Sequence, residues 1–197
     1  LNTLFLNPPS YNGYDGGAGS RYQCTREVKS FWYPTWLAQL AALVEGSRLI
    51  DAPARGITIE DILPLAKEYE LLVLYTSTPS FPNDVKIAEA FKYENKNLII
   101  GFCGAHVAIN PDHCILASDA IDFVAGNEFD FTIKEIAEGK ILEQIDGLTY
   151  KKDNKPIHNK PRALIEDMDS LPWVTKVYKD NLVTSDYYNG YMLHPYM

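Results

Sequence analysis

The stretch LLVLYTSTPS, residues 71–80, decides the fold. Its first half, 71–75, is continuously apolar, which is typical of a central strand that is covered on both faces of a parallel sheet. Its second half, 76–80, ends the strand with hydroxyl side chains and a proline and carries no charge. Ligands of open parallel sheets bind outside the carboxyl ends of the strands. The stretch therefore predicts both the middle of a sheet and part of a ligand site.

Short apolar runs alternate with amphipathic segments on both sides of this stretch, which indicates repeated β-α units. The predicted strands cover residues 4–6, 48–52, 71–75, 98–102 and 121–125, and the predicted helices cover 34–46, 58–69, 83–93, 111–118 and 128–138. Either Thr58 or Asp61 can cap the second helix. Both starts stay open because Pro64 would delete a backbone hydrogen bond unless it lies in the first turn. We predict an α/β fold: a flavodoxin-like (Rossmann-like), doubly wound sheet of about five parallel strands.

The sequence changes character after Lys140. Two β segments, 148–150 and 156–158, flank a polar turn and predict an exposed β-hairpin. Beyond it, 166–197 is rich in Pro, Asp and Tyr and has little periodicity, which is typical of a linker. We expect a domain over 1–140, a hairpin extension over 141–165 and an extended linker over 166–197. Because the chain starts at Leu1 and stops inside an aromatic segment, we expect it to be a piece of a longer protein.

The composition argues against several classes of protein. The 197 residues include 26 acidic and 18 basic side chains, a formal net charge of −8. Since Lys and Arg carry most nucleic-acid affinity, we expect no nucleic-acid partner. Cys24, Cys103 and Cys114 form no CxxC pair, which favours a reduced, cytoplasmic protein over a disulfide framework or a zinc site. No run approaches the roughly 18 apolar residues of a membrane span, so we expect no transmembrane segment.

Four segments follow predicted strands and form the candidate ligand site. They span 7–19, 76–80, 104–110 and 126–128, are rich in Gly, Ser, Thr and Asn, and are almost free of positive charge. Such a lining lets the backbone approach a large neutral ligand and bond its amides and hydroxyls. The sequence contains neither GxGxxG nor GxxxxGK[ST], which disfavours a nucleotide pyrophosphate. The candidate cofactor-binding residues are Gly16, Gly17, Thr76, Ser77, Thr78, Gly104, His106, Gly126 and Glu128.

One segment carries a family resemblance. Residues 101–139, GFCGAHVAINPDHCILASDAIDFVAGNEFDFTIKEIAEG, resemble part of the cobalamin-binding domains of radical S-adenosylmethionine (SAM) enzymes. Those domains typically carry a Gly-Gly-x-His stretch, a following Pro, and then Asp-Phe-Val and Gly-Glu before a helix. The runs NPP at 7–9, YP at 33–34 and LP at 171–172 are similar to the opening of that family and to its connector to the radical SAM barrel.

Two further runs narrow the resemblance. DGGAGSRY at 15–22 and SFWYPTW at 30–36 resemble the radical SAM proteins associated with hopanoid biosynthesis. The resemblance implies an N-terminal cobalamin-binding domain of an enzyme that remodels the sugar-derived hopanoid side chain to a cyclitol ether. It also implies that Ser77 and Thr78 line a slot for the benzimidazole tail and that His106 touches the corrin or its amide side chains. The chain alone would be a binding module without turnover.

The departures from the family pattern limit what the resemblance implies. Other cobalamin domains carry Asp-x-His-x-x-Gly, whose His ligates cobalt, but His106, His113, His158 and His194 all lack that context. Cobalt should therefore have no histidine ligand from this motif. The sequence also lacks CxxxCxxC, the three thiolates that hold a SAM-cleaving cluster. The resemblance implies that SAM and a 4Fe-4S cluster are bound by a C-terminal radical SAM domain beyond Met197.

Other readings of the same pattern stay open. A receiver-like signalling domain needs acidic residues after the first strand and a phosphoacceptor Asp after the third, and neither Asn7 nor 76–78 supplies them. A nucleotide-sugar or other small-ligand domain without cobalamin is the alternative function, although phosphate-binding loops are missing. The candidate residues also have structural readings, since hydroxyls after a strand form turns and Glu128 suits a helix N-terminus.

Overall fold

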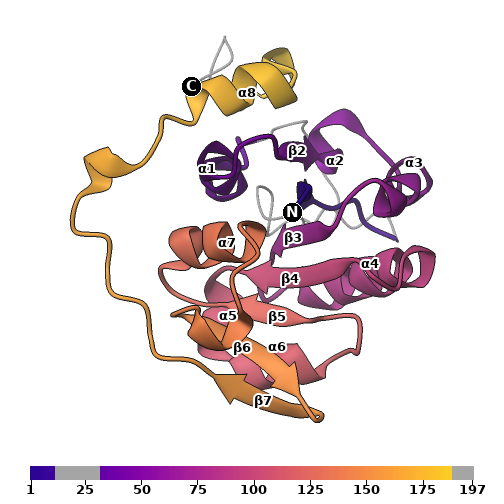
Figure 1. The fold of residues 1–197 in the computed structure, drawn as a ribbon. Coiled ribbons are helices and arrows are strands. Elements are labelled where there is room, and N and C mark those ends of the chain that lie inside the picture. Colours follow the sequence, from indigo (N-terminus) through magenta and orange to yellow (C-terminus); the bar gives the residue numbers. More distant parts are fainter. Residues whose placement is uncertain (12–31, 188–197) are drawn as a thin grey trace.

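A sheet forms the middle layer of the protein (Figure 1). The structure is a computed structural model that describes residues 1–11 and 32–187. Within these residues, seven strands form one sheet in the order β2-β1-β3-β4-β5-β6-β7. The predicted residues Gly16 and Gly17, together with Cys24, lie outside the described residues.

The first five strands of the described chain run parallel and the last two antiparallel. They are β1 (Thr3–Asn7), β2 (Arg48–Asp51), β3 (Leu71–Tyr75), β4 (Ile99–Cys103), β5 (Phe123–Ala125), β6 (Leu148–Lys152) and β7 (Lys155–His158). In the centre, Leu72 of β3 lies opposite Leu4 of β1 and Ile100 of β4. The order 2-1-3-4-5 is that of flavodoxin-like sheets, so the predicted fold class is confirmed.

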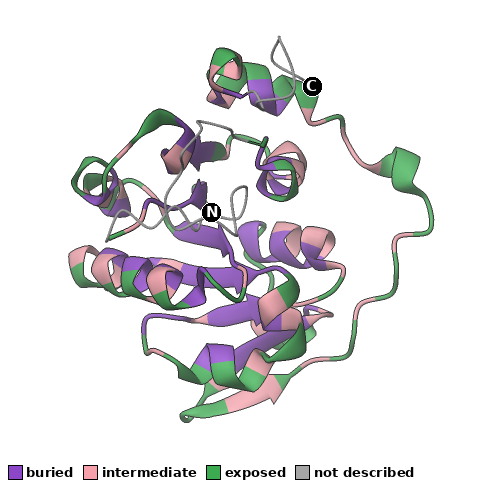
Figure 2. Cartoon of the chain, turned by 180° about the vertical axis from the view of Figure 1, so that it is seen from behind, coloured by how far each residue is buried: buried purple, intermediate pink, exposed green. Residues whose placement is uncertain are grey.

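Helices cover both faces of the sheet, and Figure 2 shows that the buried residues concentrate in the layers between them. One face carries α1 (Thr35–Leu43), α7 (Phe129–Ala137) and α8 (Thr175–Asn181), and the other carries α3 (Ile59–Ile62), α4 (Phe81–Glu94), α5 (Ala105–Ile109) and α6 (Pro111–Leu116). Side chains of β3 alternate between the two cores: Val73 faces the first and Leu72 and Leu74 the second. Each fully buried side chain of this kind contributes roughly 1.5–3 kcal/mol.

Short helical segments complete the connections. They are α2 (Ala52–Arg55), η1 (Leu63–Lys67), η2 (Leu142–Gln144), η3 (Met168–Ser170) and η4 (Thr184–Asp186). The helix predicted over 58–69 is divided into α3 and η1 because Pro64 has no N–H to continue the α-helical ladder. Thr58 and Asp61 both take part in its start, since the Thr58 backbone N–H and hydroxyl each donate to the Asp61 carboxylate at 2.9 Å. Among the described residues, no helix is long and apolar enough to cross a membrane.

The predicted hairpin is part of the sheet. Tyr150 of β6 pairs with Phe123 of β5, so the first half of β6 is buried and only β7 is the outer strand. Asp153 and Asn154 turn the hairpin with φ of 49° and 58°, the conformation that two-residue hairpin turns require. The hairpin therefore extends the parallel sheet by an antiparallel edge.

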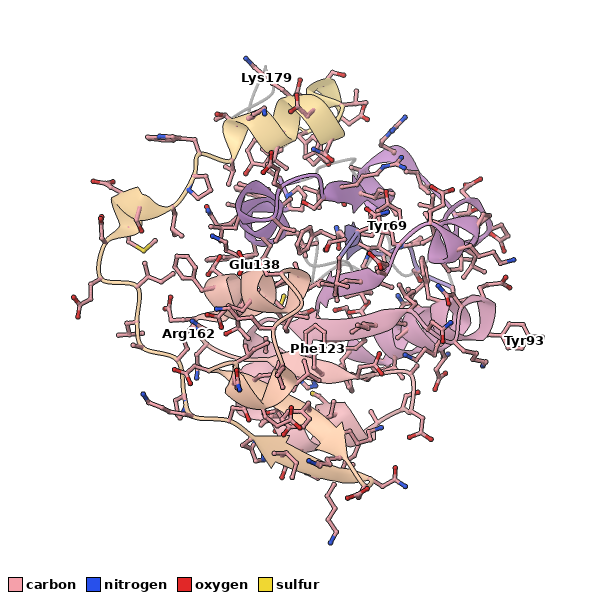
Figure 3. The ribbon with its side chains drawn as sticks, in the orientation of Figure 1. Tyr69, Tyr93, Phe123, Glu138, Arg162 and Lys179 are labelled. Carbon is pink, nitrogen blue, oxygen red and sulfur yellow. The ribbon has the colours of Figure 1, made fainter. Side chains whose placement is uncertain are left out.

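The segment after β7 runs extended along the outside of the molecule before it reaches α8 (Figure 1). Arg162 holds it against α7: its Nε donates to Thr132 Oγ1 at 2.8 Å, and its guanidinium pairs with Glu135. In Figure 3, Arg162 lies close to α7. The sequence predicts the extended part but not α8, which contacts α1 and β2 and buries Tyr178.

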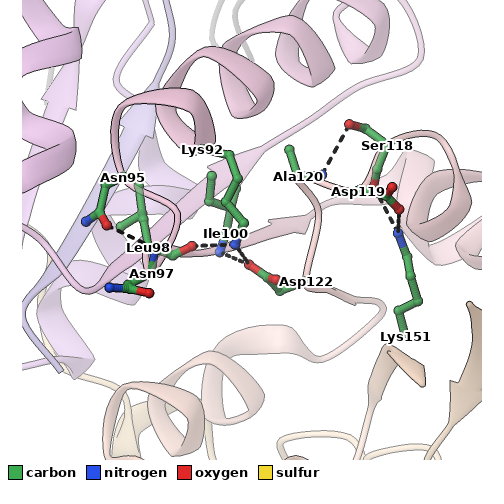
Figure 4. A network of polar contacts seen from close by, with 10 residues as sticks. All are labelled: Lys92, Asn95, Asn97, Leu98, Ile100, Ser118, Asp119, Ala120, Asp122 and Lys151. Atoms are coloured by element: carbon green, nitrogen blue, oxygen red, sulfur yellow. Dashed lines mark hydrogen bonds and ion pairs between the residues drawn. The ribbon is translucent and has the colours of Figure 1, made fainter. Parts of the chain in front are cut away.

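The amino-terminal ends of β4 and β5 are joined by an ionic network (Figure 4). Lys92 Nζ lies 2.7 Å from both Asp122 Oδ2 and the Leu98 carbonyl, and the same Asp122 oxygen accepts from Ile100 N at 2.7 Å. Lys151 bonds Asp119 and the Ser118 carbonyl at 3.1 Å nearby. These polar groups are hydrogen-bond and ion-pair partners of one another, so the network has a structural role: it holds the amino-terminal ends of the two strands together.

Gly101 of β4 makes room for an aromatic ring of β5. A Cβ at this position would lie 2.0 Å from the Phe123 ring. We expect Gly101→Ala to lower the free energy of unfolding by about 1–3 kcal/mol, because the ring must move out of a packed layer. Urea denaturation measures this loss. In a Phe123→Leu background the ring is absent and the further loss should be smaller; an equal loss in both backgrounds would contradict the steric explanation.

Candidate functional site

The predicted site lies at the carboxyl-end edge of the parallel sheet. Backbone N–H of Thr76, which follows β3, donates to the Cys103 carbonyl at the end of β4 at 2.9 Å. Thr78 Oγ1 and His106 Nδ1 lie 3.1 Å apart and join the β3–α4 turn to α5. The structure thus brings the predicted residues Thr76, Ser77, Thr78, Gly104 and His106 into one group.

The turn between β3 and α4 is held by hydroxyl groups. Ser80 Oγ accepts from Ser77 N at 3.0 Å and lies 3.0 Å from Ser77 Oγ and 3.4 Å from Thr76 Oγ1. Thr76 and Ser80 are buried, Ser77 is half-buried and Thr78 is exposed. Of the three predicted hydroxyl residues, Ser77 and Thr78 can therefore reach a ligand, and Thr76 supports them from below.

Asp84 lies beneath this turn, in the first turn of α4, and sequence reasoning missed it. Its Oδ2 lies 2.6 Å from Thr76 Oγ1, and the side chain is 1% exposed. Among the described residues Oδ1 has no hydrogen-bond partner. Burial raises the pKa of Asp84 to about 7, against the lowering effect of hydrogen bonds from the Thr76, Ser80 and Asn83 side chains. Charged side chains in the first turn of an amphipathic helix are ordinarily exposed to solvent. The sequence therefore gives no indication that Asp84 is buried.

Gly104 has a structural reason to be glycine. Its φ is +115°, and a Cβ would lie 2.6 Å from the Thr76 carbonyl oxygen, so the end of β4 lies directly against the end of β3. The chain then forms α5, a helix that the sequence pattern does not predict within 104–110. The five helical residues between Gly104 and Asn110 are too few for a helical period to show.

His106 carries an unpartnered nitrogen. Its ring forms a cluster with Phe81, at a centroid distance of 4.7 Å, and His113, at 6.5 Å. Nδ1 is near Thr78, whereas Nε2 is buried and has no hydrogen-bond partner within the described part of the chain. Burial and the neighbouring His113 lower the pKa of His106, so the ring is neutral at pH 7. A neutral imidazole with one spare nitrogen can bond an uncharged polar group.

Gly126 adjoins this group through α5, whereas Glu128 is not connected with it by the described contacts. A Cβ at Gly126 would lie 3.0 Å from the Ala108 Cα, so this glycine allows the close approach of α5. Asn127 adopts a φ of 53° between the two residues, and Glu128 precedes the first residue of α7. The described contacts do not connect Glu128 with the β3–β4 group.

The ends of β1 and β2 carry a second buried polar group that sequence reasoning also missed. Asn7 Nδ2 donates to Asp51 Oδ1 at 2.6 Å, and Tyr187 OH donates to Asp51 Oδ2 at 2.7 Å. Tyr33 stacks against both Tyr187 and Tyr178, with centroid distances of 4.3 Å. The segment after α8 is thereby anchored at the same edge of the sheet as the hydroxyl turn.

The sheet order and the helices on both faces define an α/β domain of flavodoxin-like topology. Its solved structural neighbours include TsrM from Kitasatospora setae, a radical SAM methyltransferase solved with cobalamin and a [4Fe-4S] cluster: TM-score 0.60, 14% identity, 87% of this chain and 31% of TsrM. Another is OxsB, a cobalamin-dependent SAM radical enzyme solved with aqua-cobalamin and SAM: TM-score 0.59, 17% identity, 83% of this chain and 23% of OxsB. At these identities the likeness establishes a shared fold.

One curated protein matches the chain in sequence. The chain is 32% identical over 148 residues to an uncharacterised methyltransferase of Pyrococcus horikoshii, covering 71% of this chain and 32% of that protein. No family profile matches the chain. The chain thus spans about a third of the length of the curated relative that it matches.

Asp84 should make the stability of the protein depend on pH. Its pKa is about 7 in the folded state, and an unfolded carboxyl titrates near about 3.9. Between these values the unfolded state has lost the proton that the folded state keeps, so stability falls as the pH rises. At pH 8 we expect Asp84→Asn, which resembles the neutral acid, to be more stable than the wild type by about 1 kcal/mol or more. At pH 5 the difference should shrink.

Urea denaturation across this pH range measures the effect. The exposed Asp180, replaced by Asn, is the matched control and should leave the pH dependence unchanged. A stability difference between wild type and Asp84→Asn that stays constant with pH would show that Asp84 does not titrate in this window.

Proposed function

We propose that this chain is the cobalamin-binding domain of a radical SAM enzyme and holds the cofactor at the carboxyl-end edge of its sheet. The observation that carries the proposal is an edge built from glycine, hydroxyl and neutral imidazole groups, in a fold shared with TsrM and OxsB. Cobalamin is large and presents many uncharged amides, so its binding needs hydrogen bonds and close backbone approach more than countercharge.

The residues of the edge fit such a ligand. Ser77 and Thr78 present hydroxyls at the surface of the turn, and His106 Nε2 needs a partner. Thr76 and Gly126 serve the proposed site indirectly, since Thr76 is buried and Gly126 adjoins α5. Gly104 sets the approach of the two strand ends, and Glu128, Gly16 and Gly17 stay in the proposal from the sequence alone.

The reaction belongs to the whole protein. When bound, cobalamin would supply a cobalt centre able to carry a methyl group or react with a radical. We propose that SAM and a 4Fe-4S cluster are held by a C-terminal radical SAM domain of the same chain. Residues 1–140, 141–165 and 166–197 would be the cofactor domain, its hairpin extension and the connection. The methyltransferase of Pyrococcus horikoshii, of which this chain matches 32%, supports a larger enzyme.

The hopanoid assignment is the finer part of the proposal. It rests on the sequence runs at 15–22 and 30–36, and it would make the enzyme act on the sugar-derived side chain of a hopanoid. We expect a strain that lacks the enzyme to accumulate the unmodified hopanoid.

Titration of the chain with hydroxocobalamin, followed in the visible spectrum, tests the cofactor. We expect saturable binding, and we expect Ser77→Leu to reduce it at least tenfold, because a bulky apolar side chain blocks the turn and removes a hydroxyl. Asn97→Leu is the control: Asn97 is exposed and precedes β4, at the opposite edge of the sheet, so this variant should bind like the wild type.

Two results would contradict the proposal. Binding no tighter than to an unrelated acidic protein would remove the cobalamin role and leave a different small ligand, such as a nucleotide sugar, as the alternative. Equal binding by wild type and Ser77→Leu would remove the turn after β3 from the site.

A further inference from the structure

Four side chains form a hydrogen-bonded chain that leads from the surface of the ligand edge into the protein. Ser77 Oγ lies 3.0 Å from Ser80 Oγ, which lies 3.4 Å from Thr76 Oγ1, which lies 2.6 Å from Asp84 Oδ2. Ser77 is half-buried at one end, and Asp84 is 1% exposed at the other. Three hydroxyls in series can each donate one hydrogen and accept others.

The direction of such a chain is decided at its buried end. An ionised Asp84 only accepts, so Thr76 donates to it, Ser80 donates to Thr76, and Ser77 donates to Ser80. The Ser77 oxygen then offers lone pairs to a ligand. A neutral Asp84 with its proton on Oδ2 donates to Thr76. The direction of each hydrogen bond is then reversed, so that Thr76 donates to Ser80 and Ser80 donates to Ser77. The Ser77 hydroxyl hydrogen is then free for a ligand.

The surroundings of Asp84 favour the neutral form. Burial disfavours the charged carboxylate, and within the described chain Oδ1 has no hydrogen-bond partner. Hydrogen bonds from the Thr76, Ser80 and Asn83 side chains oppose this effect without outweighing it. Two cations near Asp84 have other partners: Lys67 of the neighbouring η1 pairs with Glu94, and Lys92 of α4 itself pairs with Asp122. His106 of α5 faces Phe81 and Thr78. The proton belongs on Oδ2, the oxygen with a hydrogen-bond partner, and the raised pKa of Asp84 agrees with this assignment.

We propose that Asp84 is a positioning residue which, through Thr76 and Ser80, presents the Ser77 hydroxyl as a hydrogen-bond donor to a carbonyl or ring nitrogen of the ligand. The inference rests on the proposed function in that a ligand occupies the edge beside Ser77. Its consequence is a polarity switch: loss of the Asp84 proton turns the donor at the surface into an acceptor and weakens the binding of an acceptor group.

Binding of methylcobalamin as a function of pH tests the ligand side of this inference. Equilibrium dialysis between about pH 5.5 and pH 8.5 should show the affinity of the wild type falling roughly three- to tenfold as Asp84 ionises, the loss of one hydrogen bond. Asp84→Asn keeps a donor toward Thr76 and should bind tightly at every pH. Thr76→Val interrupts the chain and should bind weakly and without this pH dependence. Asp180→Asn, an exposed control, should follow the wild type.

Infrared spectroscopy tests the buried acid without any ligand. The difference spectrum between wild type and Asp84→Asn at pH 6 should contain the carbonyl band of a protonated carboxylic acid, and the band should disappear at high pH. A carboxylate spectrum at pH 6 would overturn the inference, as would an Asp84→Asn variant with the pH profile of the wild type. If the chain binds no methylcobalamin at all, the proposed function fails, and the infrared band alone decides whether Asp84 is the neutral end of the chain.

Discussion

The buried backbone of β3 must find hydrogen-bond partners on both sides, and much of the structure follows from that requirement. All five residues of β3 are buried, and β1 and β4 pair with it in parallel. Parallel strands need crossover connections, and alternating side chains such as Leu72 and Val73 need a helical layer on each face. The end of β3 then falls beside the ends of its neighbours. The position of the hydroxyl turn is thus a consequence of the central strand.

The sequence was sufficient for the elements whose patterns are local and long. The strand over 71–75 was predicted with the bounds that the structure has, because an apolar run ended by hydroxyls has few other readings. α5 and α8 were not predicted. α5 has only five residues, too few for a helical period to show. α8 is placed by contacts between distant residues, in particular the stacking of Tyr178 on Tyr33, and such contacts leave no periodic trace in the sequence.

For the candidate site, too, the sequence predicts some features and not others. Thr76, Ser77, Thr78, Gly104 and His106 could be named from the sequence because the rule about carboxyl strand ends needs only the strands. The contacts that orient them could not. Asp84 is one helical turn into α4 and faces inward, and Asp51 meets Tyr187 across 136 residues of chain. The Cβ that Gly126 lacks would meet Ala108 of α5, a contact between distant segments that the sequence does not reveal, and its place in the ligand site stays a prediction.

The topology adds a reason to consider the turn after β3 as part of a ligand site. In the order 2-1-3-4-5 the chain leaves β1 toward α1 on one face of the sheet and leaves β3 toward α4 on the other, and ligands of such folds bind at this switch point. On the β1 side, Tyr187 and Asn7 bond the Asp51 carboxyl, and the stacked tyrosines cover it. On the β3 side, Ser77 and Thr78 reach the surface. A ligand at this boundary would therefore meet a closed, aromatic-covered flank on one side and a neutral hydroxyl flank on the other, and the hydroxyl flank is the one able to form new hydrogen bonds.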